Sequence, residues 1–254
     1  MVPPSRQAVL TLGFVVAAFL VNLSSNFMPI NGQTIGQISN TVFKEVLITP
    51  ASYAFAIWGV IYVSLFAFAI YQLLPQQRRS PHLNPLRTMM ILACGAQMIW
   101  IVVFLSNLYG LSLVAMVVIW GALMRGYFQI NGTSQPVTRG QRWCIQVPWS
   151  LYLGWISVAT LVNVALTLFA WNWQGGGISP QAWTVALIAV AMMIAMRVVW
   201  QHQDLAFAGV FLWALMAIAV RHSEVPLLGG SALGAAAGLG ALSLYRWRLI
   251  PSAS

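Results

Sequence analysis

Acidic side chains are scarce in this chain, with only three Asp and Glu among 254 residues. Proton- and sodium-coupled transporters keep ionisable groups near the middle of the membrane, where these groups mark the ion path. All three acidic residues fall at the ends of apolar runs instead of inside them. The sequence therefore does not favour an ion-coupled pump. The three residues are Glu45, Asp204 and Glu224.

The other reactive side chains are equally restricted. The single lysine, Lys44, lies in a polar connection, which excludes a retinal Schiff base inside a helix. The three histidines lie at connections too, so axial haem ligation within the membrane is not expected, although ligation at the interface stays an open alternative. The cysteines have neither metal-ligand nor disulfide spacing and are interpreted as small apolar residues. We predict no catalytic set and no metal site. These residues are His82, His202, His222, Cys94 and Cys144.

Tryptophan is the unusual feature, with twelve Trp beside seven Tyr and twelve Phe. Several Trp lie at the ends of apolar runs, where interfacial aromatic belts are common. Others lie inside the runs, where an indole N–H requires a hydrogen-bond partner or a cavity. The interior tryptophans are Trp58, Trp100, Trp120 and Trp155.

Two of the apolar runs carry an aromatic stripe at helical spacing. Facing stripes with a few polar tips can line a pocket for a flat or elongated apolar ligand. The alternative is aromatic packing between helices, which the spacing alone favours. One stripe is Phe55, Trp58, Tyr62 and Phe66, and the other is Trp149, Tyr152, Trp155, Ala159 and Asn163.

The composition determines the environment of these stripes. The chain is 60% hydrophobic and 6% charged, with a mean hydropathy of +0.81. A soluble surface cannot be built from this composition, because its apolar patches would far exceed those that monomers tolerate. The apolar runs are continuous over roughly 20 residues, which is the length of a membrane-spanning helix and not of an alternating barrel strand.

We therefore predict an all-α, polytopic membrane helix bundle with about eight transmembrane helices. The first run follows Arg6 and is interpreted as a retained span, since it is longer than the apolar part of a signal peptide and no cleavage motif follows. A polar connection over residues 29–49 separates it from the second run. The predicted spans are residues 8–27, 50–74, 88–107, 110–127, 145–170, 181–200, 205–221 and 226–245.

The Lys and Arg residues predict the orientation. With eight spans, ten of the twelve lie on the amino-terminal side, and only Lys44 and Arg221 lie on the other. Basic connections face the cytoplasm, so both termini are predicted to be cytoplasmic in a bacterial inner membrane or an equivalent membrane. The net charge of +9 forms no stripe, and nucleic acid is not expected as a partner. The ten are Arg6, Arg78, Arg79, Arg87, Arg125, Arg139, Arg142, Arg197, Arg246 and Arg248.

The eighth run contains glycines at four-residue spacing, which lets helix backbones approach closely. Packing inside the bundle is the favoured interpretation, and a homodimer face is the alternative. The glycines are Gly230, Gly234 and Gly238.

Three segments in order resemble the tryptophan-rich sensory protein/translocator protein (TspO/MBR) family. The fifth run contains its Y-L-x-W, A-T and N positions in register. The second run reproduces the family's spacing of a lysine, a proline, a tryptophan and a tyrosine, and the third has its W-x3-F with Gln97 where Asn is usual. The matching positions are Tyr152, Trp155, Ala159, Thr160 and Asn163 in the fifth run, Lys44, Pro50, Trp58 and Tyr62 around the second, and Trp100 and Phe104 in the third.

The resemblance covers about residues 10–170 and implies a five-helix core over 1–175, followed by a three-helix extension over 176–254. Three prolines of the family are replaced, by Glu45, Thr49 and Leu151. By resemblance, the protein binds a tetrapyrrole or sterol-like lipid between its helices, for sensing or transport, and has no cofactor other than such a ligand. Membrane lipid is the other expected partner. The implied ligand-binding residues are Trp58, Tyr62, Trp100, Tyr152, Trp155 and Asn163.

Two other classes of function stay open. An ion-independent facilitator of a small neutral solute would need no charged residue at the midplane. A scaffold for assembling membrane complexes would use the small-residue face of the eighth run. An enzyme is not expected.

Overall fold

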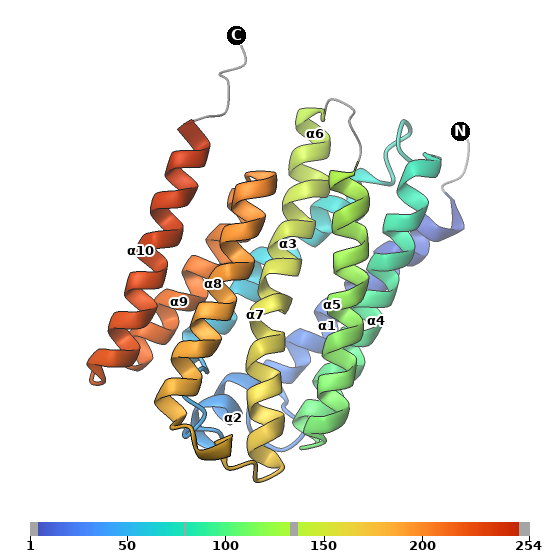
Figure 1. The fold of residues 1–254 in the computed structure, drawn as a ribbon. Helices are drawn as coiled ribbons and strands as arrows, with labels where there is room; N and C mark the ends of the chain where they lie inside the picture. Colours follow the sequence, from blue (N-terminus) through green and yellow to red (C-terminus); the bar gives the residue numbers. More distant parts are fainter. Residues whose placement is uncertain (1–4, 79, 133–136, 249–254) are drawn as a thin grey trace. The chain divides into compact units, whose positions relative to one another are not determined.

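The structure is a computed structural model that describes residues 5–78, 80–132 and 137–248, and these residues are helical or in turns (Figure 1). Within the described ranges, seven helices are long and apolar enough to cross a membrane, and a shorter apolar helix accompanies them. The predicted polytopic helix bundle is thus confirmed. Arg79, one of the ten basic residues above, lies outside the described residues.

The helix bounds follow the predicted spans closely except around the fifth span. There the helix begins at Arg139, before the predicted start, with a capping box between Thr138 and Gln141. A π-helical turn, Arg142–Gln146, precedes Pro148, whose missing N–H removes one helical hydrogen bond. The helices are α1 Arg6–Phe27, α2 Ile35–Thr41, η1 Ser52–Ala56, α3 Ile57–Tyr71, η2 Pro81–Leu83, α4 Asn84–Leu105, α5 Tyr109–Asn131, α6 Arg139–Gln141, η3 Arg142–Gln146, α7 Val147–Ala170, η4 Gly175–Gly177, α8 Pro180–His202, α9 Leu205–Arg221 and α10 Pro226–Arg248.

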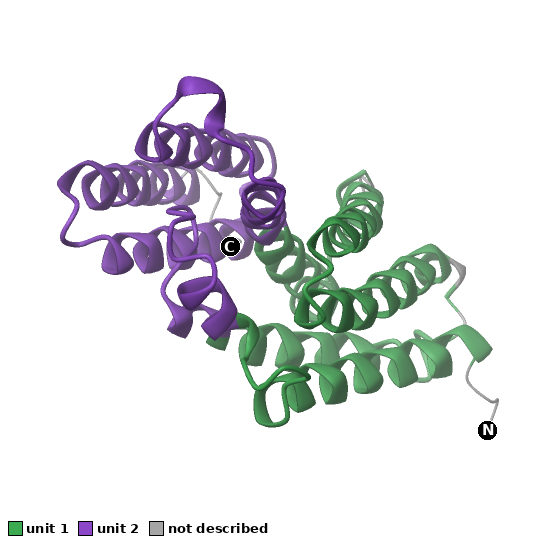
Figure 2. Ribbon diagram, turned by 90° about the horizontal axis from the view of Figure 1, so that it is seen from below, with its two compact units in different colours: residues 1–35, 56–156 green, residues 36–55, 157–254 purple. Residues whose placement is uncertain are grey.

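The chain forms two compact units, drawn in green and purple in Figure 2. Unit 1 comprises Met1–Ile35 and Ala56–Ile156, and unit 2 comprises Gly36–Phe55 and Ser157–Ser254. Helix α7 contributes to both units. The division predicted at residue 175 separates a family core from an extension. The two compact units are defined by packing instead, so they do not test this division, which stays a prediction.

Unit 1 is built on the packing of α4 against α5 and α1, with α1 also contacting α3. Arg87 lies in the first turn of α4 and is fully buried, whereas the sequence places it among the basic connections. Its guanidinium donates to Gln72 Oε1 at 2.9 Å, Asn84 Oδ1 at 2.8 Å and the Gln77 carbonyl at 2.9 Å. Arg87 therefore holds the connection between α3 and α4 against the helix end.

Unit 2 contains α8, α9 and α10 packed against one another. The glycine face of α10 is only partly internal. A Cβ at Gly238 would contact the methyl groups of Met192 and Met196 on α8, but Gly230 and Gly234 are exposed with open space around them. Internal packing is thus wrong for these two glycines, because α10 turns Ala232, Ala236 and Leu239 toward its neighbours instead.

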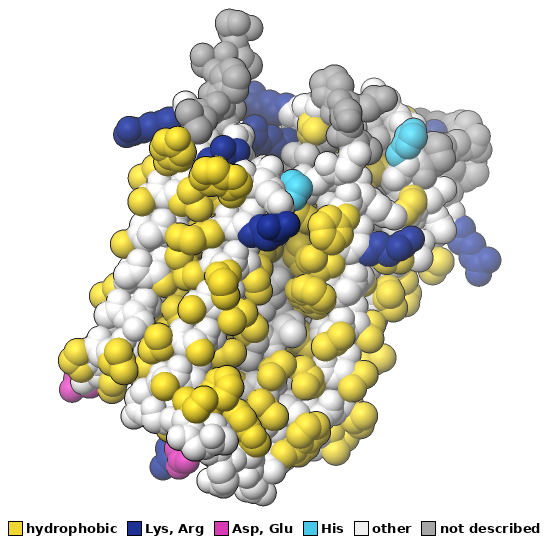
Figure 3. Space-filling view, in the orientation of Figure 1, with side chains coloured by type: hydrophobic (Ala, Val, Ile, Leu, Met, Phe, Trp, Pro, Cys, Tyr) yellow, Lys and Arg dark blue, Asp and Glu magenta, His cyan; other side chains and the backbone are white. Residues whose placement is uncertain are grey.

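The acidic residues lie outside the spanning helices, as predicted. Asp204 is the N-cap of α9, and its carboxylate accepts from the Phe207 N–H at 3.0 Å. Glu45 and Glu224 lie in connections of unit 2, and Glu224 precedes α10, at the end opposite its terminal Arg246 and Arg248. Figure 3 shows acidic side chains at the lower end of the view.

Arg221, at the carboxyl end of α9, has a structural role. Its guanidinium donates to Thr49 Oγ1 and to the backbone carbonyls of Thr49 and Lys44. The neighbouring His222 is buried, and its Nε2 lies 2.7 Å from the Leu47 carbonyl oxygen. The two residues therefore fix the connection before η1 onto α9 within unit 2. Arg221 is one of the two basic residues predicted to lie on the side opposite the other ten, and these hydrogen bonds explain its place there.

The His222 contact predicts a pH-dependent stability. Burial lowers the pKa of His222 below its ordinary 6.5, the Leu47 carbonyl raises this pKa, and the Arg221 charge lowers it further. Because the unfolded chain binds the proton more readily, this contribution to stability is complete above pH 6.5 and is lost as the pH falls toward the lower folded pKa. We expect His222→Gln to flatten the fall in Tm between pH 7.5 and 5. Parallel Tm curves for variant and wild type would contradict this expectation.

Candidate functional site

Aromatic rings from α3 and α7 converge inside unit 1. The Trp58 ring lies 5.6 Å from the Tyr62 ring and 5.8 Å from the Tyr152 ring, measured between centroids. Trp58 and Tyr62 are four residues apart, so they share one face of α3. All three side chains are buried, and Tyr152 is fully inaccessible. We call Trp58, Tyr62 and Tyr152 the aromatic cluster.

A chain of hydrogen bonds orients the cluster. The Tyr152 hydroxyl donates to Gln97 Oε1 at 2.6 Å, and Gln97 Nε2 donates to the Tyr62 hydroxyl at 2.7 Å. The Tyr62 hydroxyl in turn donates to the Ala18 carbonyl at 2.8 Å. Buried polar groups are stable only when paired, and here each donor meets an acceptor. The chain links α1, α3, α4 and α7 and fixes both phenol rings.

Gln97 is the residue that the sequence analysis did not select. It is fully buried on α4, one turn before Trp100. An amide inside an otherwise apolar span must find a partner, because an unpaired polar group in hydrocarbon is costly. That signal, together with its place at the family's Asn position, is what could have identified Gln97 from the sequence. Its two-sided amide lets it accept from one tyrosine and donate to the other.

The remaining predicted site residues are buried as well. Trp100 is buried on α4 with its ring 5.3 Å from Phe104. Trp155 is 3% exposed on α7, one turn beyond Tyr152. Asn163 belongs to unit 2, where its Nδ2 donates to Thr167 Oγ1 at 3.4 Å. Trp120, in contrast, is 37% exposed, so its position inside a span does not place it in a core.

The comparisons with known proteins identify the family. A family model described as TSPO-like protein matches residues 8–245. The chain belongs to the TSPO-like protein family. The match includes α8, α9 and α10, so it extends well beyond the resemblance over residues 10–170. No curated protein and no solved structure matches the chain.

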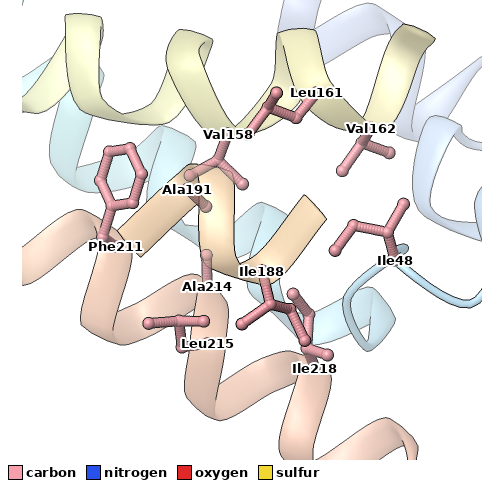
Figure 4. A pocket seen from close by; sticks show the side chains of 10 residues that line it. All are labelled: Ile48, Val158, Leu161, Val162, Ile188, Ala191, Phe211, Ala214, Leu215 and Ile218. Carbon is pink, nitrogen blue, oxygen red and sulfur yellow. The ribbon is translucent and has the colours of Figure 1, made fainter. Parts of the chain in front are cut away.

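Unit 2 of this TSPO-like protein contains a small apolar cavity (Figure 4). Its volume is about 20 Å³, room for about one water molecule. The side chains that surround it are purely aliphatic or aromatic, so a water there would lack hydrogen-bond partners. The cavity is a packing void and not a ligand site. Its lining includes Ile48, Val158, Ile188, Phe211, Ala214 and Ile218.

Proposed function

We propose that this TSPO-like membrane protein binds a flat or elongated apolar ligand, a tetrapyrrole or a sterol-like lipid, against the aromatic cluster of unit 1. One observation supports the proposal most strongly: Trp58 contacts tyrosines from two different helices within 5.8 Å. Aromatic faces give a ligand large contact area at little cost in side-chain entropy. The two tyrosine hydroxyls are engaged by Gln97 and Ala18. In this proposal the ligand therefore stacks on Trp58, the most exposed of the three rings, and the hydrogen bonds hold the two tyrosine rings that pack against it.

The proposal predicts different effects for the ring and for the hydroxyl. We expect Trp58→Leu and Trp155→Leu to weaken protoporphyrin binding about tenfold or more, because each removes an aromatic face. We expect Tyr152→Phe to change it by less than about threefold, since the ring remains and one hydrogen bond is worth roughly 1 kcal/mol. The measurement is a titration of purified protein in lipid nanodiscs, followed by porphyrin absorbance and tryptophan quenching.

Trp120→Leu is the matched control, because it removes an exposed tryptophan from the same unit. Its affinity should equal that of the wild type. If Trp58→Leu and Trp155→Leu bind protoporphyrin as tightly as Trp120→Leu, the assignment of the site is wrong.

Binding alone does not distinguish a sensor from a carrier. Flux of protoporphyrin into proteoliposomes, independent of pH and sodium gradients, would support a carrier without ion coupling. This outcome fits the positions of the three acidic residues, which lie outside the spanning helices. Binding without flux would support a sensory role.

A further inference from the structure

Unit 2 contains a large cleft at the turn between α7 and α8. Its volume is about 710 Å³, within the range of small-molecule sites. The carboxyl-terminal part of α7, the amino-terminal part of α8 and residues 45–48 form its walls. The walls include none of the ligand-binding residues that the resemblance implies, and one wall is formed by α8, which follows the predicted five-helix core.

The turn between the two helices borders the cleft. Asn172, Gly175, Gly176 and Gly177 all have positive φ, between 57° and 83°. Three consecutive glycines reverse the chain here without adding side chains. The Trp183 indole donates to the Gly175 carbonyl at 2.9 Å, and the Trp173 ring lies 5.2 Å from the Trp183 ring. The turn is therefore held by an indole hydrogen bond, and both indoles also line the cleft.

The helical walls of the cleft are largely apolar and include Leu168 and Phe169 of α7 and Leu187 of α8. Phe169 is held by an edge contact with Phe43 at 5.9 Å. The Thr184 hydroxyl donates to the Pro180 carbonyl at 2.8 Å, so it does not offer its proton to the cleft. From Pro180 to Leu187 the wall spans two helical turns, about 10 Å.

Glu45 is the one acidic side chain that lines the cleft among the described residues. The nearby Arg221 directs its guanidinium to Thr49 and to backbone carbonyls of the same connection. Glu45 lines the same cleft as the Trp173 and Trp183 indoles, and a carboxylate and indole rings both attract positive charge, so the cleft favours a cation. The apolar helical walls favour an apolar body of about 10 Å.

We propose that this cleft binds an amphiphile with an ammonium head group, whose head lies by Glu45 and Trp173 and whose apolar body extends to Leu187. The ligand is either a membrane lipid with an amine or choline head or a free amphiphilic amine. The chemistry is the same for both sources. The site is independent of the aromatic cluster in unit 1 and takes a different class of ligand.

The test uses the full chain in nanodiscs of phosphatidylglycerol, with bromooctyltrimethylammonium as the probe and bromooctanol as its uncharged analogue. Bromine quenches nearby tryptophans, so saturable quenching reports occupancy beside Trp173 and Trp183. We expect Glu45→Gln to weaken binding of the ammonium probe about fivefold, or roughly 1 kcal/mol, and to leave bromooctanol unchanged. We expect Ala165→Phe, which fills the cleft, to remove the saturable component for both probes.

Glu224→Gln is the matched control, because Glu224 is an exposed acidic residue of unit 2 that does not line the cleft. It should bind both probes like the wild type. Adding phosphatidylcholine or phosphatidylethanolamine to the nanodiscs identifies the source. Competition with the probe supports a lipid, and undisturbed binding supports a free amine. Equal affinity of Glu45→Gln and Glu224→Gln for the ammonium probe would overturn the proposal, as would unchanged quenching in Ala165→Phe with an unchanged Tm.

Discussion

Gly126→Ala is expected to destabilise unit 1 by about 3 kcal/mol, although it adds a single methyl group. A Cβ at Gly126 on α5 would overlap the indole of Trp149 on α7. Trp149 cannot move aside, because its side chain is fully buried and its Nε1 donates to the Leu123 carbonyl at 2.8 Å. The Phe68 ring also holds it, 5.6 Å away in an edge contact. A fall in Tm of the purified protein in nanodiscs would measure the effect.

Gly121→Ala is the matched control on the same helix. Gly121 is exposed, and a Cβ there meets open space. Alanine is the better helix former by up to about 1 kcal/mol, so the Tm should stay unchanged or rise. The two substitutions are chemically identical and differ only in their neighbours. If both lower the Tm equally, the close approach of α5 and α7 at Gly126 is not what limits stability there.

Arg87→Ala is expected to cost about 3–4 kcal/mol, more than a typical substitution of a charged residue. The change leaves the Gln72 and Asn84 side chains and the Gln77 carbonyl without their donor. It also removes a fully buried side chain and opens space at the start of α4. Gln72 would be affected in turn, because its amide also donates to the Ala8 carbonyl of α1. We expect a marked fall in Tm and increased proteolysis in the connection between α3 and α4.

Arg125→Ala separates this structural role from a loss of positive charge. Arg125 is an exposed arginine near the carboxyl end of α5, in the same unit. Its removal lowers the net charge by the same amount but leaves no buried acceptor unpaired. A stability loss of similar size in both variants would show that charge, and not the hydrogen-bond set of Arg87, is responsible.

The membrane bundle could be predicted from the sequence because hydrophobicity over a span is a local property. Runs of about 20 apolar residues predict helices wherever they occur, since the backbone must pair within the helix. Pairing of aromatic residues on one face also follows from helical periodicity, so Trp58 and Tyr62 were predicted together. Helix α2 was missed because it is a short helix in a polar segment without apolar periodicity.

The partners of each side chain depended on tertiary structure. Gln97 bonds Tyr62, 35 residues before it, and Tyr152, 55 residues after it, and no local pattern encodes these separations. Arg87 and Arg221 count as positive charges in the sequence, yet the fold uses both as hydrogen-bond donors to backbone carbonyls. Gly126 and Gly121 lie on one helix, and only the position of Trp149 makes them different. Local chemistry thus determined that this chain folds as apolar helices, and long-range packing decided which residues meet, because contact between helices depends on the complementarity of whole faces.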